Sequence, residues 1–230
     1  MRLLNALREQ RLDDHRYYHH SRVNQSLHLF SAFSFIIAYV FVVIDPIVSV
    51  LMGWLVAMWS RQIGHFFFEP KGYDELNTAS HEYKEDIKIG YNLKRKVILL
   101  SVWALMPVLL LISPGLFDLM APADGLYGFV YNVSVLWLCV AAAGLAFRTV
   151  QLFFIRDVQT GLVWFIKIAT DPFNDIKLYY KSPLFLLKGE RIDPMFDVRW
   201  GIESGAIARR EESSRHSHDD AQEPSEASGR

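Results

Sequence analysis

The chain has 230 residues, of which 51% are hydrophobic and 21% are charged, and its formal net charge is -1. These averages are close to those of a soluble globular protein, but the charges are unevenly distributed. All 24 Lys and Arg residues lie outside residues 23–60 and 97–147, and these two windows hold only the acidic residues Asp45, Asp118 and Asp124. This distribution excludes a soluble globule. No basic patch interleaved with aromatic residues indicates a nucleic-acid-binding protein.

Each basic-free window is longer than the roughly 20 apolar residues that cross a bilayer. Helix-breaking residues divide each window near its middle, at Asp45-Pro46 in the first and within residues 113–125 in the second. We therefore predict an all-α polytopic membrane protein with four transmembrane helices arranged as two hairpins. The predicted helices cover residues 27–44, 47–59, 97–117 and 126–147. The second is short for a crossing unless its helix continues through Arg61 toward His65.

Basic residues are frequent in the N-terminal arm and in the central loop but absent from the two turns. The positive-inside rule therefore predicts that both termini are cytoplasmic. Apolar groups punctuated by Lys and Arg follow the second hairpin and predict interfacial helices, with a helix start at Asp171-Pro172 and a stop at Lys181-Ser182-Pro183. The predicted organisation is a cytoplasmic arm (1–26), a first membrane hairpin (27–60), a cytoplasmic loop (61–96), a second membrane hairpin (97–147), an interfacial segment (148–200) and a disordered tail (201–230).

Six of the eight histidines precede the tail. Because a hairpin returns the chain to the same membrane face, the topology gathers all six at the cytoplasmic interface. Several His and carboxylates without a nearby Cys suit a redox-capable iron better than a structural zinc; the single cysteine, Cys139, lies in an apolar run. The six are His15, His19, His20, His28, His65 and His81.

The first histidine cluster surrounds the start of the first hairpin. Asn24 and His28 are four residues apart and share a helix face. Two partners for His28 remain open: His20, on nearly the same face, or His19, if the helix begins near Asn24 and the preceding loop folds back.

The second cluster follows the first hairpin. His65 and Glu69 are also four apart, so the carboxylate is either a second ligand or an acceptor that orients the imidazole. Gly64 would permit close approach of another backbone, and the three Phe residues at 66–68 form an apolar wall suited to a lipid. His81 is either a further metal ligand or part of a solvated helix.

Two segments resemble the Mpo1-like family of small membrane proteins. Residues 18–28 read Tyr-His-His-Ser-Arg-Val-Asn-Gln-Ser-Leu-His, and residues 62–69 read Gln-Ile-Gly-His-Phe-Phe-Phe-Glu, separated by a membrane hairpin. The resemblance covers about residues 17–69. Characterised members of the family are iron(II)-dependent dioxygenases that use O2 to shorten a 2-hydroxy fatty acid by one carbon.

The resemblance implies an Fe(2+) cofactor, with a long-chain 2-hydroxy fatty acid, O2 and membrane lipid as partners. It favours His19 over His20 because Asn24 follows His19 by five residues. Basic residues near the interface (Arg16, Arg22 and Arg61) either receive the lipid carboxylate or only anchor the protein. The implied iron ligands or essential histidines are His19, His28 and His65, and their implied supporting residues are Asn24, Gln62 and Glu69.

Two other functions fit parts of the pattern. The His15-x-x-x-His19-His20 sequence looks like one histidine box of a di-iron lipid hydroxylase or desaturase, although the later histidines are single. A non-catalytic membrane scaffold or binding protein would use the same histidines only as interfacial anchors. Metal content distinguishes the scaffold from the enzymes.

Overall fold

The computed structural model is all-helical, and it describes every residue except 1, 70–71, 75–76, 78, 88–92 and 195–230. Among the described residues there are two isolated β-bridges and no strands. The predicted disordered tail, 201–230, lies outside the described residues. Three helical stretches are long and apolar enough to cross a membrane: Arg22–Phe41, Pro46–Phe68 and Gly125–Ile155.

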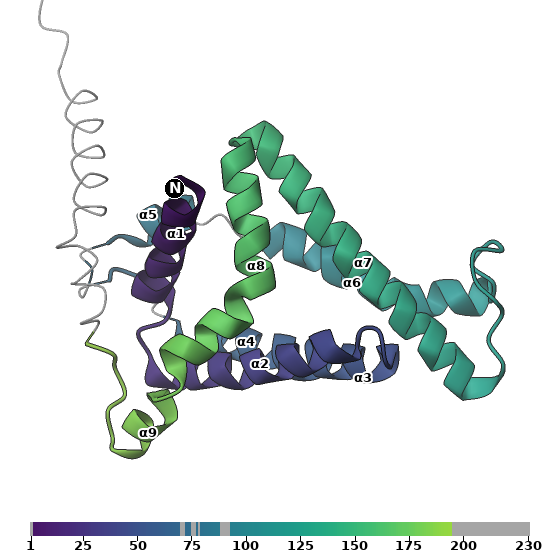
Figure 1. Cartoon of the computed structure of the whole chain (residues 1–230), viewed down its shortest axis with the longest axis horizontal. Helices are drawn as coiled ribbons and strands as arrows, with labels where there is room; N and C mark the ends of the chain where they lie inside the picture. Colours follow the sequence, from purple (N-terminus) through teal and green to yellow (C-terminus); the bar gives the residue numbers. More distant parts are fainter. Residues whose placement is uncertain (1, 70–71, 75–76, 78, 88–92, 195–230) are drawn as a thin grey trace, which may run out of the picture.

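The first hairpin consists of α2 (Arg22–Phe41) and a helical return arm (Figure 1). Its turn is fixed by Asp45, whose Oδ1 accepts the backbone N–H of Ile47 at 2.9 Å. Pro46 then occupies the first turn of the return arm, where its missing N–H costs nothing. The turn predicted at Asp45-Pro46 is therefore present.

The return arm changes helix type along its length. It comprises α3 (Pro46–Val50), η1 (Leu51–Met58), α4 (Trp59–Ile63) and η2 (Gly64–Phe68), of which η1 and η2 are π-helical. π-Helical turns are rare and frequently mark functional sites. The arm extends beyond the predicted span of 47–59, so His65 lies in its last turn and beside the start of α2.

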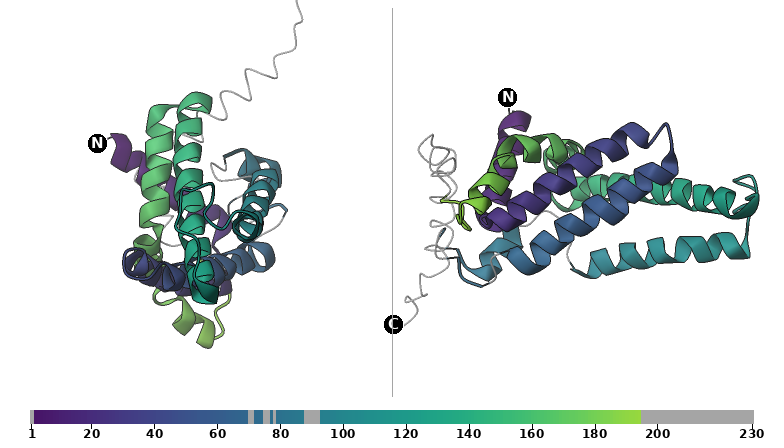
Figure 2. Two further views of the ribbon diagram at one scale, coloured as in Figure 1. Left: turned by 90° about the vertical axis from the view of Figure 1, so that its right-hand side faces the viewer. Right: turned by 90° about the horizontal axis from the view of Figure 1, so that it is seen from below.

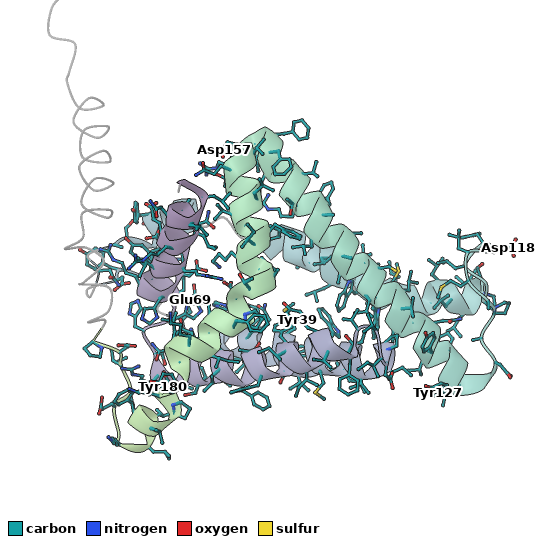
Figure 3. The ribbon with its side chains drawn as sticks, in the orientation of Figure 1. Tyr39, Glu69, Asp118, Tyr127, Asp157 and Tyr180 are labelled. Atoms are coloured by element: carbon teal, nitrogen blue, oxygen red, sulfur yellow. The ribbon has the colours of Figure 1, made fainter. Side chains whose placement is uncertain are left out.

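The second hairpin consists of α6 (Leu93–Ile112) and α7 (Gly125–Ile155). Its tip points to the same end of the molecule as the tip of the first hairpin (Figure 1 and Figure 2). Asp118 and Tyr127 mark this end, whereas Glu69 lies at the opposite end, which we call the base (Figure 3). The base is where the predicted histidine clusters lie.

Both predicted helices of the second hairpin have wrong boundaries. α6 ends at Ile112 because Pro114 disfavours a helical conformation of the residue before it. Its apolar part, Val97–Ile112, is shorter than the other candidates, so the described residues give three spans by length and composition, not four. α7 continues past residue 147 because Arg148 is buried and donates a hydrogen bond to Gln151 on the same helix at 2.7 Å.

The segment predicted to be interfacial contains α8 (Val158–Tyr179) and α9 (Ser182–Leu187). The predicted helix start at Asp171-Pro172 is wrong. Asp157 caps α8 by accepting the N–H of Thr160 at 2.8 Å, and Pro172 lies inside the helix, which bends along its length (Figure 1). α8 packs on α2, α7 and α1 (Arg2–Tyr18), and it thereby covers the base of the first hairpin.

Hydrogen bonds and an ion pair connect the ends of α1 and α2 to α5 (His81–Ile87) and to the segment after α9. The Tyr18 hydroxyl donates to the carbonyl of Lys84 in α5 at 2.5 Å. After α9, the Asp193 N–H donates to the His20 carbonyl at 2.8 Å, and the Asp193 carboxylate pairs with Arg22 at 2.9 Å. The short segment between α1 and α2 is therefore held from both sides.

Candidate metal centre

His19 lies in the short break between α1 and α2. The Ser21 side chain caps α2 by accepting the N–H of Asn24. The Nδ2 of Asn24 donates to the Tyr18 carbonyl at 2.8 Å, which fixes the break from the other side. The loop therefore folds His19 back toward α2, so that of the two partners that the sequence left open for His28, the structure has His19.

Three imidazoles meet at the base: His19 from the break, His28 from α2 and His65 from η2. One possible ligand atom of each lies within 4.8 Å of those of the other two. The Nε2 atoms of His19 and His28 are 3.2 Å apart. His19 and His28 are buried and His65 is partly buried. Such a cluster of imidazole nitrogens has the donor set of a first-row transition-metal site.

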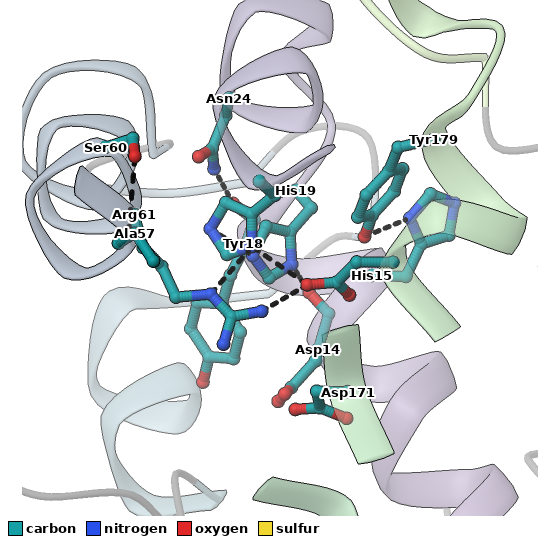
Figure 4. A network of polar contacts seen from close by, with 12 residues as sticks. Asp14, His15, Tyr18, His19, Asn24, Ala57, Ser60, Arg61, Asp171 and Tyr179 are labelled. Atoms are coloured by element: carbon teal, nitrogen blue, oxygen red, sulfur yellow. Dashed lines mark hydrogen bonds and ion pairs between the residues drawn. The ribbon is translucent and has the colours of Figure 1, made fainter. Parts of the chain in front are cut away.

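The Nδ1 atom of each of these histidines has its own partner. His19 Nδ1 contacts the Asp14 carbonyl at 2.8 Å, and His65 Nδ1 contacts Glu69 Oε2 at 2.6 Å. His28 Nδ1 contacts Arg61 Nε at 3.3 Å. Figure 4 shows the Arg61 side chain reaching into the network of polar contacts that also contains His19. Metal-bound histidines commonly donate the N–H of the outer ring nitrogen to a carbonyl or carboxylate while the other nitrogen binds the metal, and the contacts of His19 and His65 are of this kind. The residues present therefore fit a metal ion bound through Nε2 atoms.

Burial also favours the form of imidazole that binds metals. Burial lowers the pKa of His19 well below its ordinary value, and the neighbouring His65 lowers it further. The Asp14 carbonyl opposes this by raising the pKa. The net effect keeps the His19 ring neutral at physiological pH, and a neutral ring is the form that ligates a metal.

The other histidines turn away from this cluster. His20 Nε2 lies 3.2 Å from Asp74 Oδ2, and burial lowers the His20 pKa despite that carboxylate. His81 is exposed at the start of α5. His15 Nδ1 lies 3.2 Å from the hydroxyl of Tyr179. The histidines of the His15-x-x-x-His19-His20 sequence thus contact three different partners and do not form one box.

The predicted supporting residues have different positions. Glu69 contacts His65 directly, as described above. Asn24 is fully buried, and its Oδ1 lies where a Cβ on Gly64 would be, so the glycine lets η2 approach α2. The close neighbour of Gly64 is thus a side chain, not the backbone that the sequence suggested. Gln62 donates to Met58 Sδ at 3.6 Å on its own helical arm and does not join the three histidines.

A cavity of about 570 Å³ adjoins the three imidazoles. Its wall combines the base of the first hairpin with α1 and α8. Next to the imidazoles it is lined by Arg61, Phe66 and Tyr179. Arg16 and Arg22 are bound elsewhere, to Asn77 and Asp193. Of the three basic residues considered from the sequence, Arg61 is therefore the one that lines the cavity.

Ion pairs cross the cavity wall between α1, α8 and the return arm. Arg61 pairs with Asp175, and Lys167 pairs with Asp14 and, at 3.0 Å, with Asp171. Burial raises the pKa of Asp175 to about 6, although Arg61 opposes the shift. Burial also raises the pKa of Tyr179 well above its ordinary value, so its hydroxyl stays protonated. The wall therefore carries polar groups among apolar side chains, and the charges named here are paired.

Comparison with known proteins adds no relative to this site. No family model, curated protein or solved structure matches the chain. The site is therefore defined by its own geometry.

The wall residues of α8 were not predicted from the sequence. The sequence does contain one local signal for them, because ionisable residues recur at every fourth position of this helix: Lys167, Asp171, Asp175 and Tyr179. This spacing places them on one helix face. A row of ionisable groups on an otherwise apolar amphipathic helix indicates that the face meets polar partners, although it does not say which ones.

Proposed function

We propose that this protein is an iron(II)-dependent dioxygenase of the membrane, which converts a long-chain 2-hydroxy fatty acid and O2 to a fatty acid one carbon shorter. The observation that carries the proposal is the meeting of His19, His28 and His65 beside a cavity, with the outer nitrogen of each ring already in a polar contact. The resemblance of residues 17–69 to the Mpo1-like family gives the reaction class.

The three histidines would hold the iron through their Nε2 atoms. A site with three protein ligands would have room for O2 and the substrate, and the bound iron would supply the redox chemistry with O2. Glu69 and the Asp14 carbonyl fix the rings of His65 and His19. These contacts keep the Nε2 lone pairs directed at the site.

The wall of the cavity suits an amphipathic acid. Arg61 lines it and offers a guanidinium group for the substrate carboxylate, which would share that group with Asp175. Phe66 and Phe67 are 51% and 74% exposed at the end of the return arm, where an acyl chain would leave toward the bilayer. A small polar substrate would have no need of such an apolar exit.

The reaction balances without a further reductant. R–CH(OH)–COOH and O2 give R–COOH, CO2 and H2O, so that the bond between the carboxyl and hydroxyl-bearing carbons breaks. The two carbons together lose the four electrons that O2 gains. The cavity between α1 and α8 would let CO2 and water leave on the side away from the acyl chain.

The membrane arrangement that we propose is multi-pass, with four crossings and cytoplasmic termini. The uneven distribution of Lys and Arg supports it, as does the common direction of the two hairpin tips (Figure 1). The shorter apolar helix Val97–Ile112 would form the third crossing together with the residues that flank it. The metal centre would then lie at the cytoplasmic interface.

The direct test is turnover by the purified protein. Incubation with iron(II), O2 and 2-hydroxypalmitate should give pentadecanoic acid, detected by mass spectrometry, and the His65→Ala variant should give none above background. Absence of the shortened acid with the wild-type protein, or equal turnover by His65→Ala, would refute the proposed function.

Two other histidines provide matched controls for this test. His81 is exposed and His20 pairs with Asp74, so neither contacts the three imidazoles. His81→Ala should retain wild-type turnover. His20→Ala should retain iron binding, whereas His19→Ala should lose it; the reverse result would show that the family register is wrong.

A further inference from the structure

The hydrogen-bond partners of the three imidazoles determine where their protons lie. A backbone carbonyl only accepts, so His19 Nδ1, bonded to the Asp14 carbonyl, carries a proton and leaves Nε2 with a free lone pair. His65 Nδ1 faces a carboxylate and is protonated for the same reason. Both rings are therefore in the tautomer that can ligate a metal through Nε2.

His28 is in the opposite tautomer. Its Nδ1 lies 3.3 Å from Arg61 Nε, and a guanidinium N–H can only donate, so His28 Nδ1 accepts. The proton of the neutral His28 ring is therefore on Nε2. This agrees with the 3.2 Å contact between the Nε2 atoms of His28 and His19, which needs one donor and one acceptor. Without metal, a proton lies between two of the three ligand atoms.

A carboxylate, that of Asp175, also lies near His28 Nδ1. Asp175 Oδ2 is 3.6 Å from His28 Nδ1, slightly beyond hydrogen-bond distance, and it also pairs with Arg61. A small rotation of the His28 ring or of the Arg61 side chain would replace a donor at Nδ1 with an acceptor. Asp175 is buried on α8, so water does not readily take its place.

The geometry points to Asp175 as a positioning residue that sets the tautomer of His28 for metal binding, with Arg61 holding the opposite tautomer when the site is empty. This inference rests on the proposed metal centre. When a metal binds, His28 would release the proton on Nε2 to the adjoining cavity and take up one proton at Nδ1, where Asp175 would accept its hydrogen bond. The ring would stay neutral, and its Nε2 lone pair would be free to bind the ion.

The inference makes Asp175 and Arg61 antagonists, although they form one ion pair. If the pair served only to hold α8 against the return arm, loss of either partner would weaken the site in the same direction. If Asp175 sets the ligating tautomer, its loss weakens metal binding, whereas loss of the Arg61 Nε donor strengthens it. The signs of the two effects therefore separate the explanations.

The test measures Co2+ affinity of the full-length protein in detergent without O2, from the visible absorption of the bound ion. Asp175→Asn should weaken binding by about 10- to 100-fold, as expected when a histidine ligand loses its outer acceptor. Asp171→Asn is the matched control, because Asp171 is equally buried one turn earlier and pairs with Lys167. It should change affinity by less than about threefold, well below the 10- to 100-fold loss expected for an outer partner of a metal ligand.

Arg61→Lys keeps a positive charge beside Asp175 but removes the Nε donor, and it should tighten Co2+ binding. Asp175→Glu should recover part of the affinity lost in Asp175→Asn. Equal effects of Asp175→Asn and Asp171→Asn, or weaker binding in Arg61→Lys, would overturn the inference while the metal centre stands. No Co2+ binding by the wild-type protein would refute the metal centre and the inference together.

Discussion

The base of the first hairpin and the body of the second hairpin use polar groups in opposite ways. At the base, buried polar side chains join different elements, as Arg61 joins the return arm to Asp175 of α8. In the second hairpin, the buried Ser134 donates to Val130 on its own helix at 2.8 Å. A buried polar side chain that bonds within its own helix meets only its own need for a hydrogen-bond partner. One that bonds to another element also fixes the distance between the two elements of the site.

The contacts between helices also differ, although a hydrogen bond from Trp137 Nε1 to the Trp103 carbonyl joins the two helices of the second hairpin. In the second hairpin Trp103 stacks on Trp137 with ring centroids 5.9 Å apart, and Trp54 of the return arm adds a further contact to Trp103. Such aromatic packing tolerates small displacements, because dispersion changes gradually with distance. The ion pairs and hydrogen bonds at the base depend on direction as well as distance. We therefore expect substitutions at the base to cost more and to alter the site.

The largest loss of stability is expected from Lys167→Met. Lys167 pairs with Asp14 of α1 and Asp171 of α8, and its removal leaves the buried Asp171 with the longer, 3.5 Å pair to Arg11. Breaking a buried pair costs about 3–5 kcal/mol, and the lower end applies because Asp14 is 40% exposed. Denaturant unfolding in detergent measures this loss. Lys177→Met, at an exposed position of the same helix, is the control and should cost less than about 0.5 kcal/mol.

Gly64→Ala should have a smaller effect on stability but a direct effect on the metal centre. The new Cβ would overlap Asn24 Oδ1 and push η2, with His65, away from α2. Overpacking of this kind costs about 1–3 kcal/mol. We expect weaker Co2+ binding together with a lower unfolding free energy.

Gly144→Ala is the matched control in the second hairpin. Its Cβ would lie 3.6 Å from the Leu99 side chain, which is an ordinary contact. This substitution should leave Co2+ affinity unchanged and stabilise α7 by up to about 1 kcal/mol. Equal Co2+ affinities of the Gly64→Ala and wild-type proteins would show that the close approach at Gly64 does not position His65.

The smallest effect is expected from Trp137→Phe. Trp137 Nε1 donates to the Trp103 carbonyl at 2.8 Å, and phenylalanine keeps most of the ring contact but loses this hydrogen bond. The expected cost is about 1 kcal/mol, with turnover and metal affinity unchanged. A change in metal affinity would contradict the separation of the second hairpin from the metal centre.

The helices themselves were largely predictable because their signals are local. Asp45-Pro46 combines a helix cap with a proline that suits the first helical turn, and the hairpin turn follows from these two residues. The apolar windows likewise predicted membrane-length helices. The predicted helix boundaries were less accurate where a charged residue has a hydrogen-bond partner on its own helix. The predicted end of α7 at residue 147 is an example, because Arg148 donates to Gln151 and the helix continues.

The candidate site was predictable only in part. The hairpin predicted that the histidines on either side of it meet at one face, and the family resemblance selected His19, His28 and His65 among them. Asp175 could not be placed near His28, because 147 residues separate them and no local pattern records which face of α2 a distant helix covers. The polar row on α8 indicates a buried partner, but only the packing of α8 on α2 identifies it.

Iron content tests the central claim most directly. Anaerobic reconstitution with iron(II), followed by removal of unbound metal, should leave close to one iron per chain in the wild-type protein and less than about a tenth of an iron in His28→Ala, whereas His81→Ala should match the wild type. Less than a tenth of an iron per wild-type chain, or equal iron in His28→Ala, would contradict the metal centre and favour a non-catalytic membrane scaffold.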